Sequence, residues 1–178
     1  MTMIAGAGLA NMIAPALSGI TEEAASRLIE PVNLAWMEEG RGWSALDYVQ
    51  AIATLHRTGR VLGAFFSRFD VLMSPVTAEI APPLGFLAGA GMTLDAFFDR
   101  FWAHAPFTPI FNATGCPAMS VPLFWTEPLA GAPRGLPVGV HFGAGPGADG
   151  LLFALAGQLE RARPWAGRRP ALGTDRSA

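Results

Sequence analysis

Two long stretches of the sequence carry no charged side chain. Residues 101–126 contain no Asp, Glu, Lys or Arg, and residues 1–21 are also free of charge up to Glu22. Charged side chains keep a segment at the surface, whereas uncharged apolar ones fill cores. Both stretches are therefore expected in the interior. The few strands that the sequence predicts cannot cover so much apolar surface, which indicates an incomplete domain.

Overall composition limits the class of protein. Of the 178 residues, 51% are hydrophobic and 15% are charged, which is typical of a globular chain that buries one core. The net charge is −2, and basic residues do not cluster before Arg168 and Arg169. Nucleic acid is therefore not an expected partner.

Two residue types restrict the chemistry. All twelve basic residues are arginine, so no mechanism that needs a lysine base, a lysine Schiff base or a phosphate-binding lysine can operate within this chain. The single cysteine, Cys116, cannot form an internal disulfide. Disulfides are rare in reducing compartments, so a cytoplasmic location is expected.

The charge-free N-terminal stretch is expected to form a buried helix and loop. A secretory signal needs a positive residue before its apolar run, but the first basic residue here is Arg27. A membrane span needs about 20 predominantly apolar residues, and Asn11, Pro15 and Ser18 interrupt this one. Targeting and a membrane partner are therefore not expected.

Apolar periodicity and capping residues predict the helices. The clearest begins at Ser44, whose spacing to Asp47 resembles a capping box. Its apolar stripe includes Leu46, Val49 and Val61, with arginines on the solvated side. The full set of expected helices covers residues 3–14, a stretch beginning near Thr21, then 32–39, 44–69, 93–102, 107–114 and 147–161.

Short strands are expected at residues 70–74, 118–121 and 137–143. Gly40 and Gly115 are expected to end the helices that precede them. The fold class is therefore α/β: part of a domain in which a mixed sheet is flanked by helices. The final polar residues, 167–178, are expected to form a flexible tail.

Several residues imitate catalytic or metal sites. Cys116 with His104 suggests a thiol protease, yet no third group orients the histidine. His56, His104 and His141 match no compact metal motif, so neither a metal nor a cofactor is expected. Ser120 lacks the glycines of a nucleophile elbow. The glycine-rich run 143–147 lacks the lysine of a phosphate loop.

Four segments occur in an order that resembles the amidase-signature family. The most specific is Phe107-Thr-Pro-Ile-Phe-Asn-Ala-Thr-Gly-Cys-Pro-Ala-Met-Ser-Val-Pro122. The segment Phe69-Asp-Val-Leu-Met-Ser-Pro75 precedes it and is followed by an Ala-Pro-Pro-Leu-Gly loop at residues 81–85. The segment Gly135-Leu-Pro-Val-Gly-Val-His141 comes after it. The family usually has Gln at the position of His141. The closing helix, 151–165, ends in Ala-Arg-Pro-Trp. The resemblance covers most of residues 1–166, which it identifies as the C-terminal portion of an amidase domain.

The resemblance implies hydrolysis of a carboxamide through an acyl-serine. The family's two serines and lysine lie upstream in a Gly/Ser-rich region, and this chain has no lysine and only isolated serines. No residue is therefore assigned as catalytic. Asn112, Thr114 and Cys116 are the expected substrate-binding residues, although Asn112 and Thr114 more readily hold their own loop.

The alternatives are a binding or interaction module derived from an amidase and one half of a split amidase. The expected partners are a small amide substrate and either a missing N-terminal half or further copies of the chain.

Overall fold

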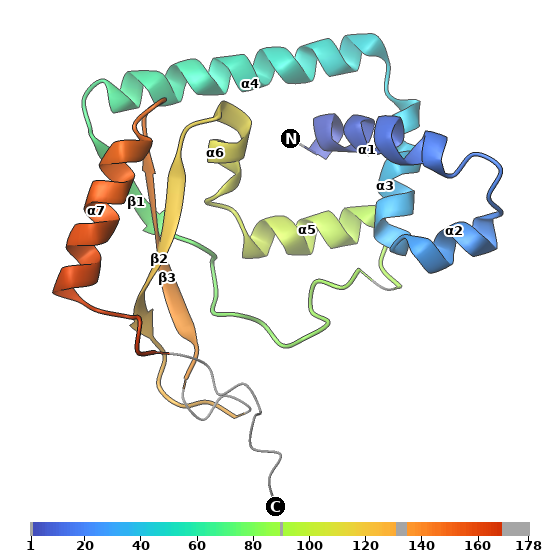
Figure 1. The fold of residues 1–178 in the computed structure, drawn as a ribbon. Coiled ribbons are helices and arrows are strands. Elements are labelled where there is room, and N and C mark those ends of the chain that lie inside the picture. Colours follow the sequence, from blue (N-terminus) through green and yellow to red (C-terminus); the bar gives the residue numbers. More distant parts are fainter. Residues whose placement is uncertain (1, 90, 131–134, 169–178) are drawn as a thin grey trace, which may run out of the picture.

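The computed structural model describes residues 2–89, 91–130 and 135–168. Helices and strands form two units joined by one long helix, α4 (Figure 1). The helical unit contains α1, α2, α3 and α5, and the sheet unit contains β1, β2, β3, α6 and α7. The elements are α1 (Thr2–Ala16), α2 (Glu22–Leu28), α3 (Pro31–Gly42), α4 (Ala45–Phe66), β1 (Val71–Pro75), α5 (Leu94–His104), α6 (Pro109–Thr114), β2 (Ala118–Trp125), β3 (Pro137–Ala144) and α7 (Asp149–Ala162).

The sheet has three strands in the order β1-β3-β2, and both pairings are antiparallel. The predicted combination of helices with a small sheet is confirmed. A mixed sheet would also need a parallel pair, and the described strands form none. β2 is longer than predicted because it continues through Pro122 with an irregularity between Val121 and Phe124. An edge strand tolerates proline because one side of it needs no hydrogen bonds.

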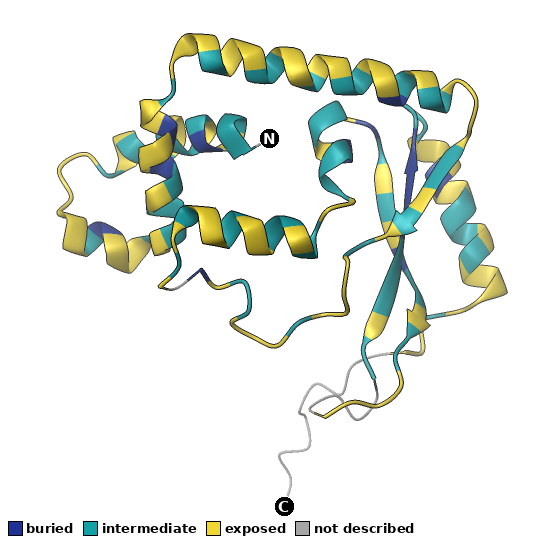
Figure 2. Ribbon diagram, turned by 180° about the vertical axis from the view of Figure 1, so that it is seen from behind, coloured by how far each residue is buried: buried dark blue, intermediate teal, exposed yellow. Residues whose placement is uncertain are grey.

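Helices cover both faces of this sheet. α7 packs on β2 and β3, where Val121, Phe142, Ala144 and Leu152 form a buried cluster. On the opposite face, α6 and the end of α4 enclose a second cluster of Leu62, Phe111 and Cys116. The core therefore lies in two layers around the sheet, and Figure 2 shows buried segments in this unit.

The long helix α4 begins as predicted. Ser44 accepts from the Asp47 backbone N–H, and the Asp47 carboxylate accepts from the Ser44 backbone N–H, which forms the expected capping box. Hydrogen bonds from Ser44 hold the pKa of Asp47 below its usual value. The helix ends at Phe66, where Ser67 caps it, rather than at residue 69.

The expectation that the apolar stripe of α4 faces a core is only partly correct. Leu62 is buried, but Leu46, Val49 and Val61 are 65%, 61% and 67% exposed. Nothing in the described residues covers the side of the helix on which Leu46 and Val49 lie. The exposed Arg57 and Arg60 lie on the same side.

The helical unit is held by an unusually close crossing of α1 and α3. A Cβ added to Gly40 would lie 2.2 Å from the Gly6 carbonyl oxygen, so only glycine fits there. The prediction that Gly40 ends its helix is wrong, because α3 continues to Gly42 and Gly40 serves as the contact point with α1. The Trp36 indole N–H also donates to the Thr2 carbonyl at 3.0 Å, which fixes the start of α1.

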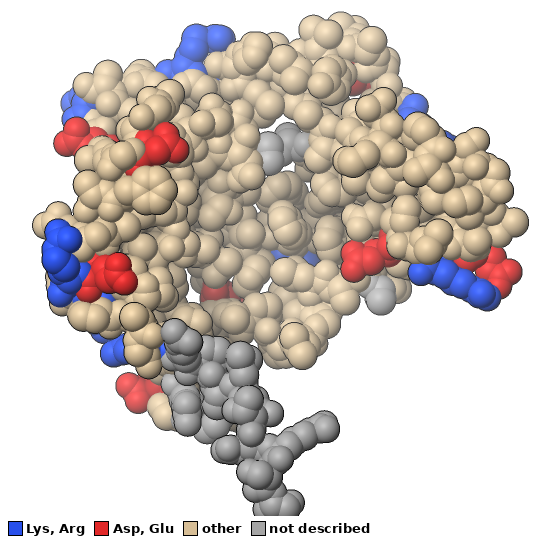
Figure 3. Space-filling model, viewed as in Figure 1, with Lys and Arg blue, Asp and Glu red and all other residues tan. Residues whose placement is uncertain are grey.

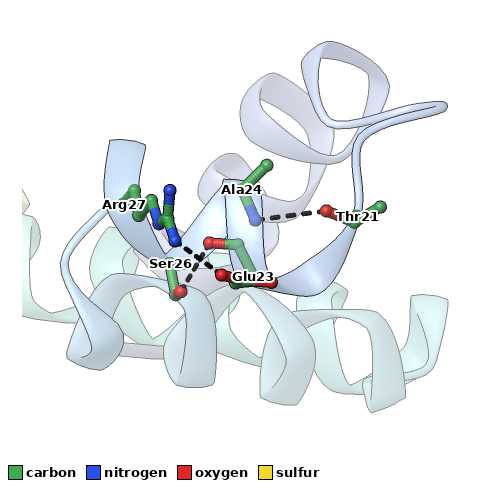
Figure 4. A network of polar contacts seen from close by, with 5 residues as sticks. All are labelled: Thr21, Glu23, Ala24, Ser26 and Arg27. Atoms are coloured by element: carbon green, nitrogen blue, oxygen red, sulfur yellow. Dashed lines mark hydrogen bonds and ion pairs between the residues drawn. The ribbon is translucent and has the colours of Figure 1, made fainter.

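α2 is an exposed helix stabilised by local polar contacts (Figure 4). The Thr21 hydroxyl accepts from the Ala24 backbone N–H at 3.3 Å, which confirms the predicted start of this helix. Glu23 and Arg27, one turn apart, form an ion pair whose side chains are 78% and 76% exposed. Ser26 donates to the Glu23 carbonyl oxygen at 2.9 Å. These contacts determine the local shape of α2 and bury little surface.

The uncharged stretches are less buried than predicted. Within residues 101–126, only Phe111, Cys116 and Val121 are buried, and Phe124 is 48% exposed. Figure 3 shows a surface on which charged atoms are sparse. The interior prediction is wrong for most of this stretch because the described residues supply too few partners to cover it.

No helix in the described ranges is long and apolar enough to span a lipid bilayer. The N-terminal charge-free stretch forms α1, which packs on α3 as a small-residue helix. Residues 169–178, most of the expected flexible tail, lie outside the described residues.

Candidate functional site

The sheet face opposite α7 gathers most of the residues that the sequence singled out. Along β3, Gly139, His141 and Gly143 alternate with residues that pack toward α7. His141 lies in register with Ser74 of β1 and Ser120 of β2. Because paired residues in antiparallel strands point to the same side, these three polar side chains form one row across the sheet.

His141 is the most buried polar residue of this row, at 4% exposed. Its Nδ1 lies 3.1 Å from the Ser74 hydroxyl oxygen, and that hydroxyl donates to the Pro75 carbonyl at 3.0 Å. When that proton is given to the Pro75 carbonyl, the Ser74 oxygen can accept a hydrogen bond from Nδ1 of His141 in the tautomer that carries a proton there. Burial lowers the pKa of His141, which favours the neutral ring.

The partners of the two side chains limit what the pair can do. A general base must accept the proton of its nucleophile, whereas the Ser74 hydroxyl has the Pro75 carbonyl as an acceptor. The Ser74–His141 contact is therefore a structural tie between β1 and β3, and among the described residues no carboxylate bonds to the ring. Sequence analysis missed this contact, since the two residues are 67 positions apart and only the strand register brings them together.

α6 is docked on the sheet through one aromatic ring. The Phe111 ring lies over Gly143, where an added Cβ would meet ring carbons at 2.0 Å. It also packs edge-on against His141, with ring centroids 5.0 Å apart. Because Gly143 has no side chain and Phe111 is only 4% exposed, the position of α6 relative to β3 is tightly specified.

The end of α6 and the loop after it hold the three predicted substrate-binding residues: Asn112 and Thr114 lie in the helix and Cys116 in the loop. Gly115 ends the helix as predicted, in the left-handed conformation at φ 69°. The Thr114 hydroxyl donates to the Ile110 carbonyl at 2.8 Å, so it is engaged within its own helix. Cys116 is buried with Leu62 and Phe111, and Asn112 is exposed. The three side chains therefore do not converge on one point, and their role in binding substrate stays a prediction.

The other imitations of active sites do not assemble. His104 ends α5 beside the Phe86 ring, whereas Cys116 belongs to the cluster under α6, and no hydrogen bond joins them in the described ranges. The described residues hold no group of three or more His, Cys, Asp or Glu suited to a metal ion. Ser120 faces Gly139, whose added Cβ would lie 2.7 Å from its hydroxyl oxygen, so this serine fills a close contact between strands.

A cavity of about 310 Å³ adjoins the polar row. It lies where β1 ends and β3 begins, and its walls come from the loop 77–81 and from Pro137, Val138 and Gly139. A second cavity, about 650 Å³, opens between α1, α2 and α3, away from the sheet. The first is next to the row, because Pro75 follows Ser74 and Gly139 contacts Ser120, but the row residues themselves do not line it.

Known proteins resemble the chain over most of its length. A family model described as Amidase matches residues 11–153. The chain is 40% identical over 116 residues to "Putative amidase AmiC" of Mycobacterium tuberculosis, covering 65% of this chain and 23% of that protein. It is 34% identical over 149 residues to the 6-aminohexanoate-cyclic-dimer hydrolase of Paenarthrobacter ureafaciens, covering 80% and 28%.

Solved structures share the fold. The structure of 6-aminohexanoate cyclic dimer hydrolase matches with a TM-score of 0.71 at 22% identity, over 95% of this chain and 35% of that one. A crystal structure of an amidase matches with a TM-score of 0.70 at 24% identity, over 91% and 34%. The chain thus spans 23–28% of the length of these curated relatives.

Proposed function

Because this chain belongs to the amidase family, we propose that it is part of an enzyme that hydrolyses the C–N bond of a carboxamide through an acyl-serine. The match of the family model to residues 11–153 carries this proposal. Residues 1–166 then form the C-terminal portion of the amidase domain. This portion supplies scaffold and one wall of the substrate site, and another polypeptide segment supplies the two serines and the lysine.

The chemistry explains why a further segment is required. Amide hydrolysis needs an activated nucleophile, a proton for the departing nitrogen and hydrogen-bond donors for the oxyanion. This chain has no lysine, and its seven serines lie at least seven positions apart. The Ser74 hydroxyl has the Pro75 carbonyl as a hydrogen-bond acceptor beside His141, so this pair is a poor candidate for a nucleophile and its base. The chain alone is therefore expected to be inactive.

The end of α6 and the loop after it are the proposed contact with the acyl part of the substrate. Asn112 is exposed and free to reach a ligand, while Thr114 and Cys116 hold the loop from beneath. Gly115 and Pro117 restrict the backbone on either side of Cys116, so the loop presents a defined surface. A change of Cys116 should alter preference among acyl groups and should not abolish hydrolysis.

The substrate is proposed only as a class, a small carboxamide. One relative is named for its action on the cyclic dimer of 6-aminohexanoate, so cyclic amides belong in any substrate panel beside linear aliphatic and aryl amides. We also propose a cytoplasmic location, which a single buried cysteine suits. Association with the remaining portion of an amidase is preferred to a homo-oligomer, because only the former brings a lysine.

The proposal is tested by assaying the purified chain against that amide panel, alone and mixed with the N-terminal portion of an amidase relative. We expect turnover at the level of a heat-killed control for the chain alone, and amide hydrolysis for the mixture. Turnover by the isolated chain that persists in Ser120→Ala would contradict the argument that the chain lacks the catalytic serines and lysine. An inactive mixture that nevertheless forms a stable complex would favour a binding module derived from an amidase.

A further inference from the structure

α6 reaches the sheet through one side chain. The helix has six residues and packs mainly on α4. Its Phe111 ring lies over Gly143 and edge-on to His141, with ring centroids 5.0 Å apart. Phe111 and His141 are both 4% exposed, so each ring shields the other from water. The place of α6 on the sheet therefore depends on the contact between these two rings.

The surroundings of His141 carry no charge. The strands beside it, β1 and β2, contain no Asp, Glu, Lys or Arg, and neither does α6. The end of α4 faces it with apolar side chains, and of the residues that form the cluster under α6 only Cys116 is titratable. The acids nearest to β1 along the chain, Asp70 and Glu79, are exposed. The only hydrogen bond that the described residues give the ring joins its Nδ1 to Ser74.

Protonation of His141 places a charge in these surroundings. A buried charge without a partner is unfavourable, so the charged ring must gain contact with water. Ladders of backbone hydrogen bonds join the three strands, and five paired residues hold β1 to β3. α6 is short and ends at Gly115, so lifting Phe111 uncovers the ring without breaking the sheet. Acid should therefore loosen α6 before it separates the strands.

We propose that His141 is a positioning residue for the substrate-binding end of α6, which it holds on the sheet through Phe111 only while its ring is neutral. Asn112 directly follows Phe111, and Cys116 follows the helix, so both move when this ring leaves its place. The inference rests on the proposed function, because it takes the end of α6 and the loop after it to contact the acyl group. It adds a regulation of that site: the contact is present near neutral pH and is lost in acid.

The test uses the full 178-residue chain and its single cysteine as the probe. Cys116 is 8% exposed and packs with Phe111, so a thiol reagent reaches it when α6 lifts. Labelling uses a pyridyl disulfide, which reacts in acid as well as at neutral pH. Protection of Cys116 is the labelling rate of the urea-unfolded chain divided by that of the folded chain at the same pH. It should fall at least about tenfold between pH 7 and pH 5, because uptake of one proton changes the lifting equilibrium by up to about tenfold per pH unit.

Three variants separate the charge of the ring from its packing. Glutamine in His141→Gln can donate to Ser74 but cannot become charged, so protection should change by less than about twofold over this pH range. Ser74→Ala removes the hydrogen-bond partner of the ring and should lower protection at pH 7 by about fivefold. Ser120→Ala is the matched control, because Ser120 is the other serine in register with His141 and the described residues show no hydrogen bond between them. It should lower protection by less than about twofold.

Hydrogen exchange in α7 shows whether the opening is local. Backbone amides of residues 152–159 should stay protected at the pH where Cys116 becomes reactive. Loss of protection at both places together would mean global unfolding and would overturn the proposal. So would a pH-dependent loss of protection that persists in His141→Gln, or equal effects of Ser74→Ala and Ser120→Ala. A chain in which fewer than about half of the molecules are lifted at pH 5 would also overturn it, since the site would then stay assembled in acid.

An amide assay on the chain mixed with the N-terminal portion of an amidase relative separates this proposal from the proposed function. Where labelling finds half of the molecules lifted, the KM of the unaltered chain should rise about twofold relative to that of His141→Gln, and the two kcat values should respond to pH alike. The expected labelling without any amide hydrolysis would reject the proposed function and keep the pH-dependent docking of α6. Amide hydrolysis with the same pH dependence of KM in both chains would keep the function and reject the role of His141 at the substrate site.

Discussion

The sheet unit and the helical unit are stabilised by different kinds of contact. The sheet unit depends on large side chains that fill space on both faces of three strands. The helical unit depends on the absence of side chains at Gly6 and Gly40, which lets two helix backbones meet. Removing atoms should therefore damage the first unit most, whereas adding a single methyl group should damage the second.

The largest effect is expected from Phe111→Ala in the sheet unit. Phe111 is 4% exposed and fills the space between Gly143, His141 and Leu62, so its removal leaves a cavity. We expect a loss of about 3–5 kcal/mol in the free energy of unfolding, measured by urea denaturation. Phe153→Ala, at a side chain 78% exposed, should change it by less than about 0.5 kcal/mol. Equal effects would show that α6 is not docked through this ring.

The next effect is expected from Gly40→Ala in the helical unit. The new Cβ would lie 2.2 Å from the Gly6 carbonyl oxygen, so α1 and α3 must move apart. Overpacking of this kind costs about 1–3 kcal/mol, and hydrogen exchange should increase in α1 and α3 rather than in the sheet. Gly8→Ala on α1, where an added Cβ meets nothing within 4 Å, should instead stabilise by about 0.5–1 kcal/mol. A stable Gly40→Ala would contradict the close crossing.

A smaller, pH-dependent effect is expected from His141. Its pKa is lowered by burial, so the unfolded chain binds a proton more readily than the folded chain. The stability that this difference controls is fully present above the unfolded pKa of about 6.5 and is lost as the pH falls toward the folded pKa. His141→Gln should flatten the fall in stability below neutral pH, measured as urea midpoints across a pH series.

The smallest effect is expected from Arg27→Ala on α2. This side chain pairs with Glu23, but both are about three-quarters exposed, so solvent screens the attraction. The free energy of unfolding should fall by no more than about 0.5 kcal/mol, and the difference should shrink further at high salt. A larger loss would mean that α2 contributes to the stability of the helical unit through this ion pair.

Local features of the fold could be predicted from sequence, and contacts between distant segments could not. The Ser44–Asp47 capping box and the left-handed Gly115 are each decided within a few residues, and both predictions are confirmed. Gly40 was misjudged because its role is set by Gly6, which lies 34 positions away. A glycine can either end a helix or let another helix approach closely. Only the packing around it distinguishes these two roles.

The candidate site shows the same division. The motif around Cys116 predicted a helix that ends at Gly115, and this end is present. The tie between Ser74 and His141 depends on strand register, which no single segment encodes. Residues 101–126 were predicted to be buried because they carry no charge. Whether such a stretch is buried depends on which other segments cover it, and the described residues leave much of it exposed.

The bridging helix α4 also has a mechanical consequence. Its 22 residues rise about 1.5 Å each, which makes a rod of about 33 Å that contacts α1 and, further along, α6 (Figure 1). A tilt of about 5° at the α3 end would move the far end by about 3 Å over that length. If α4 moves as one rigid rod, a slight reorientation of the Gly6–Gly40 crossing displaces α6, Phe111 and the loop after α6.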